Sequence, residues 1–307
     1  MRVLITGGGG FQGSHVAEHC LGAGNHVTIL NTPSLEAENN LASFAQDVSI
    51  VWGSITDPEI VEKAIRSQDV VFHLAARINV DESLEVPSSV LNVNVMGTFN
   101  VLEAIREHGC RMIYVSSGEA YGSATHSPII ETAELRPHSP YAASKAAADR
   151  ACFAYWKTYG IDVSIVRPCN IYGPRQKAGK GGAVIPIFVE RALARKPLVV
   201  HGTGEQRREY MHVDDLVTAY QLVLENANIQ GEVINLGTGE TPSIKEIAEF
   251  IAQRLGASVE YGPARPGEVG GLILDTTKAR LLGFAPHVSF WDGLDRYIQW
   301  RQSFWTG

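Results

Sequence analysis

The sequence is poor in cysteine and carries no cysteine pattern that implies disulfides or a metal site. Its four cysteines stand alone along 307 residues, without a C-x-x-C pair and without a cysteine–histidine cluster at the spacing of zinc ligands; they are Cys20, Cys110, Cys152 and Cys169. Isolated thiols are typical of a reducing compartment. We therefore expect a cytoplasmic protein with no bound metal.

Long hydrophobic runs and an excess of positive charge are also absent. No stretch reaches the ~18 consecutive apolar residues of a membrane span, and the chain opens on the strand-like MRVLIT instead of a signal peptide. The net charge is −7 at pH 7 and the isoelectric point is about 5.8. This balance argues against nucleic-acid binding, although a local pocket can still hold an anionic small molecule. We expect neither a membrane nor a nucleic acid as a partner.

What the sequence does contain is a regular alternation of short apolar runs and helical patterns. The apolar runs cover 2–6, 26–30, 48–53, 70–75, 112–116, 163–168 and 233–237. They are continuously apolar, which is typical of strands buried on both faces of a parallel sheet. Helical patterns include 13–22, 58–66, 89–107, 141–158 and 214–226. This alternation predicts an α/β fold with a Rossmann-like, doubly wound parallel sheet.

The composition of the sequence changes after residue 168. The segment GPRQKAGKGG (173–182) is too basic and too rich in glycine to belong to a core. A helical pattern and an apolar run then return over 213–238. We predict a Rossmann domain over 1–168 that 213–238 rejoins, and a smaller discontinuous C-terminal lobe made of 169–212 and 239–307.

A glycine-rich turn follows the first expected strand directly, in TGGGGFQGSHV (6–16). Gly8, Gly10 and Gly13 form G-x-G-x-x-G, and Gly7, Gly10 and Gly13 form G-x-x-G-x-x-G. Glycines here allow a tight turn and a close approach of the backbone to a pyrophosphate at the helix N-terminus. The pattern alone also fits a flexible loop, but its place between a strand and a helix predicts a dinucleotide site.

The end of the second expected strand bears on the choice between NAD and NADP. Asn31 stands where an acidic residue usually binds the ribose; its amide can hydrogen-bond a 2′-hydroxyl but lacks the charge that repels a 2′-phosphate. Between Arg2 and Lys63 the chain has no Lys or Arg, and Glu36 and Glu38 follow Asn31 closely. Because a 2′-phosphate would find no cation in this stretch, we predict NAD as the cofactor.

A serine, a tyrosine and a lysine suggest redox chemistry at a sugar hydroxyl. Tyr141 and Lys145 are spaced i, i+4 and share one face of a helix. A neighbouring ammonium and a positive nicotinamide ring would favour the phenolate, which could then act as a base. Ser117, at a strand end, could hydrogen-bond the same hydroxyl. Y-x-x-x-K also occurs by chance on ordinary exposed helices, so its weight comes from the glycine-rich turn and the serine.

With these motifs the chain resembles the extended short-chain dehydrogenases that act on nucleotide sugars, the NAD-dependent epimerase/dehydratase family. The resemblance covers nearly all of the sequence. The segments that match the family are, in chain order, TGGGGFQGSHV (6–16), HLAA (73–76), NVNVMGTFNVLEA (92–104), SSGEAYG (116–122), SPYAASK (139–145), RPCNIYGP (167–174), GEQRREYMHVDDL (204–216), INLGTG (234–239) and RPGE (265–268).

The resemblance implies roles for particular residues. The implied cofactor contacts are Gly7, Gly10, Phe11, Gln12, Gly13, Asn31, Ser54, Ile55, Leu74, Ala75, Ala76, Asn94, Tyr141, Lys145 and Pro168. The family usually has Ile at the position of Gln12 and often Asp at that of Ser54. The implied catalytic set is Ser117, Tyr141 and Lys145. Asn170, Arg208 and Arg265 match positions that hold the nucleotide diphosphate, a task that suits the planar fork of arginine, although either Arg could instead form a surface ion pair.

Glu119 is the residue that separates the reactions of this family. If the chain stays extended, Glu119 and Ser117 point to the same side. In the family, dehydratases and sugar-acid decarboxylases tend to carry an acid at the position of Glu119, since loss of water after C4 oxidation needs a base at C5. Dehydratases, however, usually have Asp or Ser where this chain has Gly118. Glu119 could also merely orient the sugar or cap a backbone amide.

We therefore expect an NAD-dependent nucleotide-sugar epimerase, with a UDP-sugar favoured, in which hydride leaves C4 and returns. A 4,6-dehydratase or a UDP-glucuronate decarboxylase using Glu119 is the alternative, and a non-catalytic NAD-binding regulatory protein is an alternative of another class. A homodimer is expected because the helical patterns 89–107 and 141–158 carry surplus apolar residues. These are Val95, Phe99, Leu102, Ala147, Ala151 and Ala154.

Overall fold

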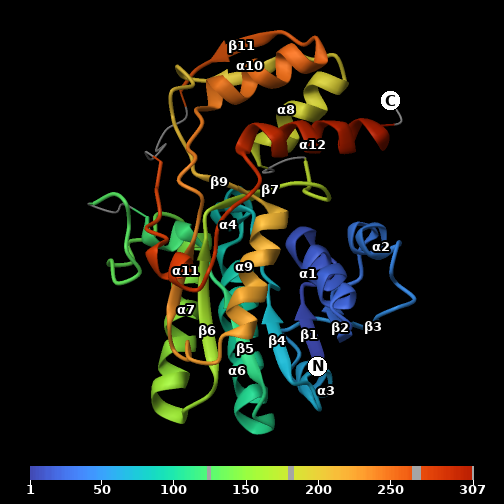
Figure 1. Cartoon of the computed structure of the whole chain (residues 1–307), viewed down its shortest axis with the longest axis vertical. Coiled ribbons are helices and arrows are strands. Elements are labelled where there is room, and N and C mark those ends of the chain that lie inside the picture. The colour runs from blue at the N-terminus through green and yellow to red at the C-terminus, as the bar shows by residue number, and fades with distance from the viewer. Residues whose placement is uncertain (123–125, 179–182, 265–270, 306–307) are drawn as a thin grey trace.

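A seven-stranded parallel sheet forms the centre of the larger part of the molecule (Figure 1). The structure is a computed structural model that describes residues 1–122, 126–178, 183–264 and 271–305. The strand order is β10-β6-β5-β4-β1-β2-β3, and every neighbouring pair is parallel. The strands are β1 Arg2–Thr6, β2 His26–Asn31, β3 Ser49–Trp52, β4 Val70–His73, β5 Arg111–Val115, β6 Val163–Pro168 and β10 Val233–Leu236.

Helices cover both faces of this sheet, as continuously apolar strands require. On one face the core residues come from α1 Phe11–Gly22, α2 Leu35–Leu41, α9 Val213–Glu225 and α11 Thr277–Leu281. On the other face they come from α3 Pro58–Ile65, α6 Gly97–His108 and α7 Pro140–Tyr159. The predicted Rossmann-like doubly wound fold is therefore confirmed.

A smaller lobe lies at one end of the sheet, at the top of Figure 1. Its core is separate and gathers side chains from three helices, including Phe188, Ile247 and Leu294. The helices are α8 Val184–Leu193, α10 Ile244–Leu255 and α12 Phe290–Ser303, and strands β8 Leu198–His201 and β11 Val259–Gly262 pair beside them. A short pair, β7 Asn170–Tyr172 with β9 Tyr210–His212, stands apart from the main sheet. The predicted domain bounds stay a prediction.

The predicted helix over 89–107 is interrupted. The chain forms α4 Val80–Glu85 and α5 Pro87–Leu91, then a π-helical segment Asn92–Met96, before α6 begins. Such π segments are frequent at functional sites. The π segment places Asn94 in the buried interior, with its side chain 2% exposed.

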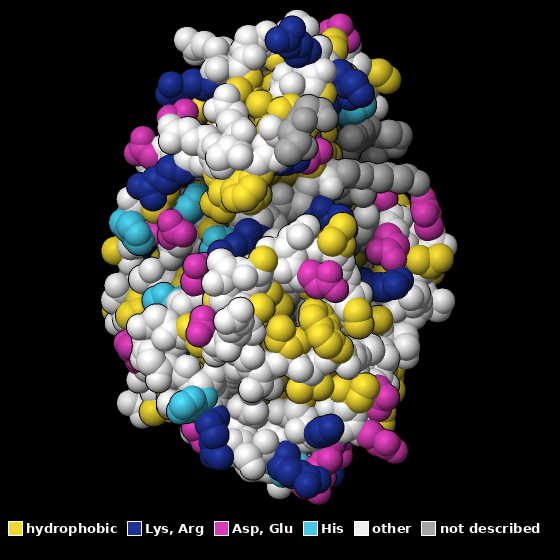
Figure 2. Space-filling view, turned by 90° about the vertical axis from the view of Figure 1, so that its right-hand side faces the viewer, with side chains coloured by type: hydrophobic (Ala, Val, Ile, Leu, Met, Phe, Trp, Pro, Cys, Tyr) yellow, Lys and Arg dark blue, Asp and Glu magenta, His cyan; other side chains and the backbone are white. Residues whose placement is uncertain are grey.

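Charged side chains of both signs are interspersed over the side of the molecule drawn in Figure 2, with a hydrophobic patch on its lower part. That side therefore shows no extended basic surface of the kind that binds nucleic acid. Across the described ranges, no helix has the length and apolar character needed to cross a membrane.

Candidate active site

The glycine-rich turn between β1 and α1 folds tightly, as the sequence predicts. Gly7 has a φ of +73°, and the amide of Gly10 donates to the carbonyl of Gly7 at 3.0 Å. A Cβ on Gly13 would lie 2.2 Å from the Gly7 carbonyl oxygen, so no larger residue fits there. Gly10 is the N-cap of α1 and provides no side-chain hydrogen bond to the first turn. This end of α1, where Phe11 is the first helical residue, has the geometry of a pyrophosphate site.

Gln12, where the family usually has Ile, has a specific partner in the second half of the chain. Its Oε1 accepts a hydrogen bond of 3.3 Å from the hydroxyl of Tyr220, which is buried on α9. The sequence offered no signal for Tyr220, since 208 residues separate the two. The contact ties the first turn of α1 to the helix that packs beside it.

The adenosine side of the site differs from the expectation in two respects. Asn31 shapes the glycine turn, because its Oδ1 accepts from the amide of Gly9 at 3.1 Å. A cation does lie in this region after all: Nζ of Lys177 is 3.0 Å from Oε2 of Glu36. The premise that no cation comes near was wrong, because the chain returns to α2 after 141 residues. Glu36 neutralises Lys177, which agrees with NAD.

Ser54 and Ile55 follow β3 but use their side chains within the protein. The hydroxyl of Ser54 hydrogen-bonds Thr56 at 2.8 Å. The side chain of Ile55 is buried against Gly97, where an added Cβ would lie 2.5 Å from its Cδ1. Contact with an adenine would therefore fall to the backbone and the exposed edge of this turn.

The segment after β4 runs beside the glycine turn and is held in place by Asn94. The position of a Cβ on Gly7 would be 2.8 Å from the amide nitrogen of Ala75, so the two loops touch. Leu74, Ala75 and Ala76 are half-buried there. Oδ1 of Asn94 accepts from the Arg77 amide at 2.7 Å, and its Nδ2 donates to Arg77 O at 2.9 Å and to Ser144 Oγ at 2.8 Å. Asn94 thus fixes this segment against α7.

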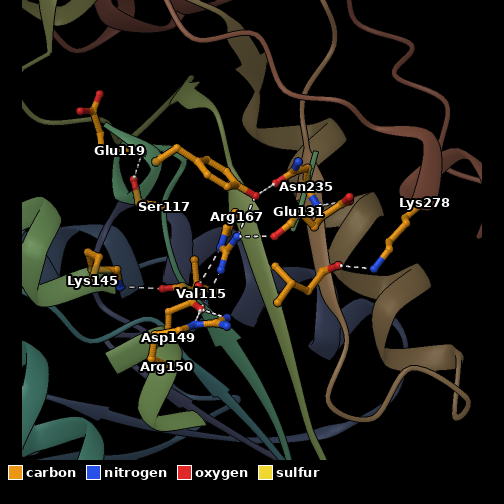
Figure 3. A network of polar contacts seen from close by, with 12 residues as sticks. Val115, Ser117, Glu119, Glu131, Lys145, Asp149, Arg150, Arg167, Asn235 and Lys278 are labelled. Atoms are coloured by element: carbon orange, nitrogen blue, oxygen red, sulfur yellow. Dashed lines mark hydrogen bonds and ion pairs between the residues drawn. The ribbon is translucent and has the colours of Figure 1, made fainter. Parts of the chain in front are cut away.

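Tyr141 and Lys145 lie in the first turns of α7, whose N-cap Ser139 accepts a hydrogen bond from the Ala142 amide. Lys145 is 4% exposed, and its Nζ donates to the carbonyl of Val115, the last residue of β5, at 2.6 Å (Figure 3). Burial lowers the pKa of Lys145 to about 8. The side chain is therefore protonated but easily neutralised at moderately alkaline pH.

Burial and two neighbouring side chains shift the pKa of the Tyr141 phenol in this structure. Burial raises the pKa of Tyr141 to about 12, a hydrogen bond with Ser117 lowers it, and the negative charge of Glu119 raises it. Phenolate formation at neutral pH therefore needs further positive charge, such as an oxidised nicotinamide ring would bring.

Ser117 and Glu119 do not lie on an extended strand, and that premise was wrong. β5 ends at Val115, and Ser117 caps a 3-10 turn over Gly118–Tyr121 by accepting from the amide of Glu119 at 3.2 Å. Both residues still line one cavity. Among the described residues the Glu119 carboxylate makes no hydrogen bond or ion pair, and Figure 3 shows it directed away from the polar network around Arg167.

The cavity joins residues from both parts of the molecule. Its lining is Ser117, Gly118, Glu119, Gly122, His138, Pro168, Cys169, Asn170, Arg208, Leu272 and Leu274. The predicted sugar-nucleotide residues Asn170 and Arg208 thus line the same cavity as Ser117. Arg265 lies outside the described residues. His138 was missed although it directly precedes the matched block SPYAASK, and Cys169 and Leu274 were missed because their exposure depends on tertiary packing.

A buried polar network supports the turn that carries Glu119. Arg167, 1% exposed, forms an ion pair with Asp149 of α7, with Nε 2.8 Å from Oδ2. Its NH1 also donates to the hydroxyl of Tyr121, which in turn donates to Asn235 of β10 at 2.7 Å (Figure 3). The network connects the 3-10 turn, α7, β6 and β10, and so fixes these elements relative to one another. In the described parts of the chain, no three His, Cys, Asp or Glu side chains cluster as metal ligands.

Comparisons with known proteins agree with this geometry. A model of the NAD-dependent epimerase/dehydratase family matches residues 3–237. The chain is 37% identical to a dTDP-glucose 4,6-dehydratase of Streptomyces niveus, over 98% of this chain and 92% of that protein. It is 34% identical to a putative UDP-glucose 4-epimerase of Methanocaldococcus jannaschii, over 98% of both. A dTDP-glucose 4,6-dehydratase of Streptomyces venezuelae, solved with NAD bound, superposes with a TM-score of 0.93 at 36% identity and covers 100% of this chain and 99% of its own.

Proposed function

The chain belongs to the NAD-dependent epimerase/dehydratase family, and within this enzyme family, whose cofactor is NAD, we propose that it is a nucleotide-sugar 4,6-dehydratase. It oxidises C4 of a nucleoside-diphosphate hexose and then removes water across C5 and C6. Relatives with this activity and relatives with epimerase activity are about equally similar to the chain. The choice therefore rests on the site.

The position of Glu119 is the observation that carries the proposal. Its carboxylate opens into the same cavity as Ser117, and it makes no hydrogen bond or ion pair among the described residues. It is close enough to Tyr141 for its charge to raise the pKa of the phenol. An unpaired carboxylate at the reacting end of a cavity can accept a proton, whereas one already capping an amide could not do so freely.

Each residue then has a definite task. Bound NAD would accept the C4 hydride and later return it. Tyr141 takes the proton from the 4-hydroxyl, and Ser117 hydrogen-bonds that oxygen. Lys145 holds the nicotinamide ribose and contributes positive charge near the phenol. Glu119 removes the C5 proton, which the new C4 carbonyl makes acidic.

Epimerisation, which the sequence favoured, is the second candidate, and Gly118 supports it. A Cβ at Gly118 would lie 3.2 Å from the carbonyl oxygen of Pro168, so the glycine leaves room beside the catalytic serine. Room to turn a keto-sugar over is what an epimerase needs. A decarboxylase would also use Glu119 but requires a sugar acid as its substrate.

Incubation with UDP-, dTDP-, GDP- and CDP-sugars, with products identified by mass and NMR, tests the proposal. The panel contains both UDP-sugars, which the sequence favoured, and dTDP-sugars. Relatives of the chain are named for acting on each of the two. Asn170 and Arg208 would hold the diphosphate. Loss of water supports dehydration, an unchanged mass supports epimerisation, and loss of carbon dioxide supports decarboxylation.

We also infer that the chain acts as a homodimer through α6 and α7. Of the apolar residues named from the sequence, Leu102 and Ala151 prove to be core residues. Two other apolar residues of this region lie at the surface. Met96, at the end of the π segment before α6, and Tyr159, the last residue of α7, are each 54% exposed. Apolar side chains at the outer face of a helix pair favour burial against a second copy. Light scattering that gives a monomer mass at micromolar concentration would contradict this inference.

A further inference from the structure

His138 lines the same cavity as Glu119. The backbone of Gly122, one residue after the 3-10 turn that carries Glu119, forms a parallel bridge with Arg136. The amide of Arg136 donates to the carbonyl of Tyr121 at 3.3 Å. A Cβ on Gly122 would lie 3.1 Å from Cδ2 of His138. The bridge therefore holds the imidazole against the end of the turn, and both side chains line one cavity.

Dehydration needs an acid as well as a base, because hydroxide is a poor leaving group. Gly118 supplies no acid. Among the described residues that line the cavity, the other titratable side chains are Glu119, Cys169 and Arg208. Glu119 is occupied as the base, burial raises the pKa of the Cys169 thiol well above its usual value, and a guanidinium does not release its proton.

We propose that His138 is a catalytic residue that donates the proton with which the C6 hydroxyl of the sugar leaves as water. Imidazole is the side chain that exchanges a proton most readily near neutral pH. The assignment rests on the proposed dehydration. The natural substrate is then a hexose with a free 6-hydroxyl, since only a hydroxyl leaving group needs the proton.

The protons and electrons of the step balance. Glu119 removes the proton from C5, the electron pair of that bond forms the C5–C6 double bond, and the C6–O bond breaks with its electrons on oxygen. His138 protonates that oxygen, so water leaves. The hydride taken from C4 returns to C6, and Glu119, after its proton has exchanged with solvent, returns a proton to C5. At the end Tyr141 holds the proton of the 4-hydroxyl and His138 has lost one. Tyr141 releases a proton to solvent and His138 takes one up, which restores the enzyme.

The test compares His138→Gln with the wild type on two substrates. With the natural 6-hydroxyl, we expect water loss to fall by roughly 10²-fold, the scale of a lost general acid. C4 oxidation and C5 exchange continue, so reduced cofactor accumulates and recovered substrate carries solvent deuterium at C5. With the 6-chloro-6-deoxy analogue, whose chloride needs no proton, the variant should react within about threefold of the wild type. His19→Gln, at an exposed position of α1, is the matched control and should behave as the wild type.

Each other outcome counts against the assignment. Unchanged water loss by His138→Gln would show that another group is the acid. Equal losses on both substrates, without deuterium at C5, would show a structural role instead. If the wild type removes no water from any hexose substrate, the proposed dehydration is wrong, and the role of His138 is wrong with it. If the wild type does remove water, the dehydration stands and the variant alone tests the role of His138.

Discussion

The guanidinium of Arg167 and the carboxylate of Asp149 meet in a fully buried ion pair, with Nε 2.8 Å from Oδ2 and NH2 2.8 Å from Oδ1. Asp149 stands one turn after Lys145 on α7, and Arg167 also donates to Tyr121 in the turn that carries Glu119. The pair therefore links the helix that carries Tyr141 to the turn that carries Glu119. Its bidentate geometry gives directional strength that a single contact lacks.

Asp149→Asn should destabilise the fold strongly. The change leaves the buried Arg167 charge without its counter-ion, which costs about 3–5 kcal/mol. The free energy of unfolding, measured by urea titration, should fall by that amount. Glu134→Gln is the control, because it removes the exposed ion pair with Arg136 and should cost less than about 1 kcal/mol. Similar losses for both variants would contradict the structural role given to the buried pair.

Lys145 should make stability rise with pH above about 8. Its pKa is about 8 in the folded chain against an ordinary value of 10.5, so between these values the unfolded chain binds a proton that the folded chain does not. Stability therefore increases with pH across that window. Relative to Lys145→Met, the wild type should gain about 1–3 kcal/mol between pH 7 and pH 10.

Urea titrations of both proteins at each pH provide the comparison. Lys157→Met, at an exposed position of the same helix, is the control and should follow the wild type. Parallel profiles for the wild type and Lys145→Met would mean that burial does not perturb this lysine.

Tyr141→Phe should keep the fold and the cofactor but lose turnover by roughly 10²-fold or more, the scale of a lost general base. The phenyl ring can replace the partly buried phenol without changing its packing. NAD released by heat, measured against the wild type, reports cofactor retention, and a coupled product assay reports turnover. Activity close to that of the wild type would remove Tyr141 from the mechanism.

Glu119→Gln should stop the reaction after C4 oxidation. The amide keeps the size of the side chain but cannot accept the C5 proton, so product formation should fall by roughly 10²–10⁴-fold. Reduced cofactor should then accumulate during the reaction. If the enzyme is an epimerase, the amide can still orient the sugar, and activity should fall less than about tenfold, equivalent to ~1.4 kcal/mol of barrier.

The elements that could be predicted from the sequence are those set by local patterns. The apolar strands, the glycine turn at Gly7 and Gly13, and the helical spacing of Tyr141 and Lys145 all depend on residues near one another in sequence. A resemblance to a family added the distant positions Asn170 and Arg208, which do reach the cavity. Their roles remain proposals.

What could not be predicted depends on contacts between distant segments. Lys177 reaches Glu36 across 141 residues, and Arg167 reaches Asp149 only because β6 lies beside α7. The 3-10 turn after Ser117 is not predictable from the local sequence, because local propensity does not reveal the bridge between Gly122 and Arg136. That same bridge is what brings His138 to the cavity.

The fate of the C5 proton tests the central claim most directly. The wild-type enzyme is incubated with the nucleotide-hexose panel in deuterium oxide, and the product is analysed by mass and NMR. The proposed reaction predicts a product that has lost one water and carries solvent deuterium at C5, because Glu119 removes that proton and returns one exchanged with solvent. A product of unchanged composition with its original hydrogen at C5 would contradict dehydration and establish epimerisation at C4 instead.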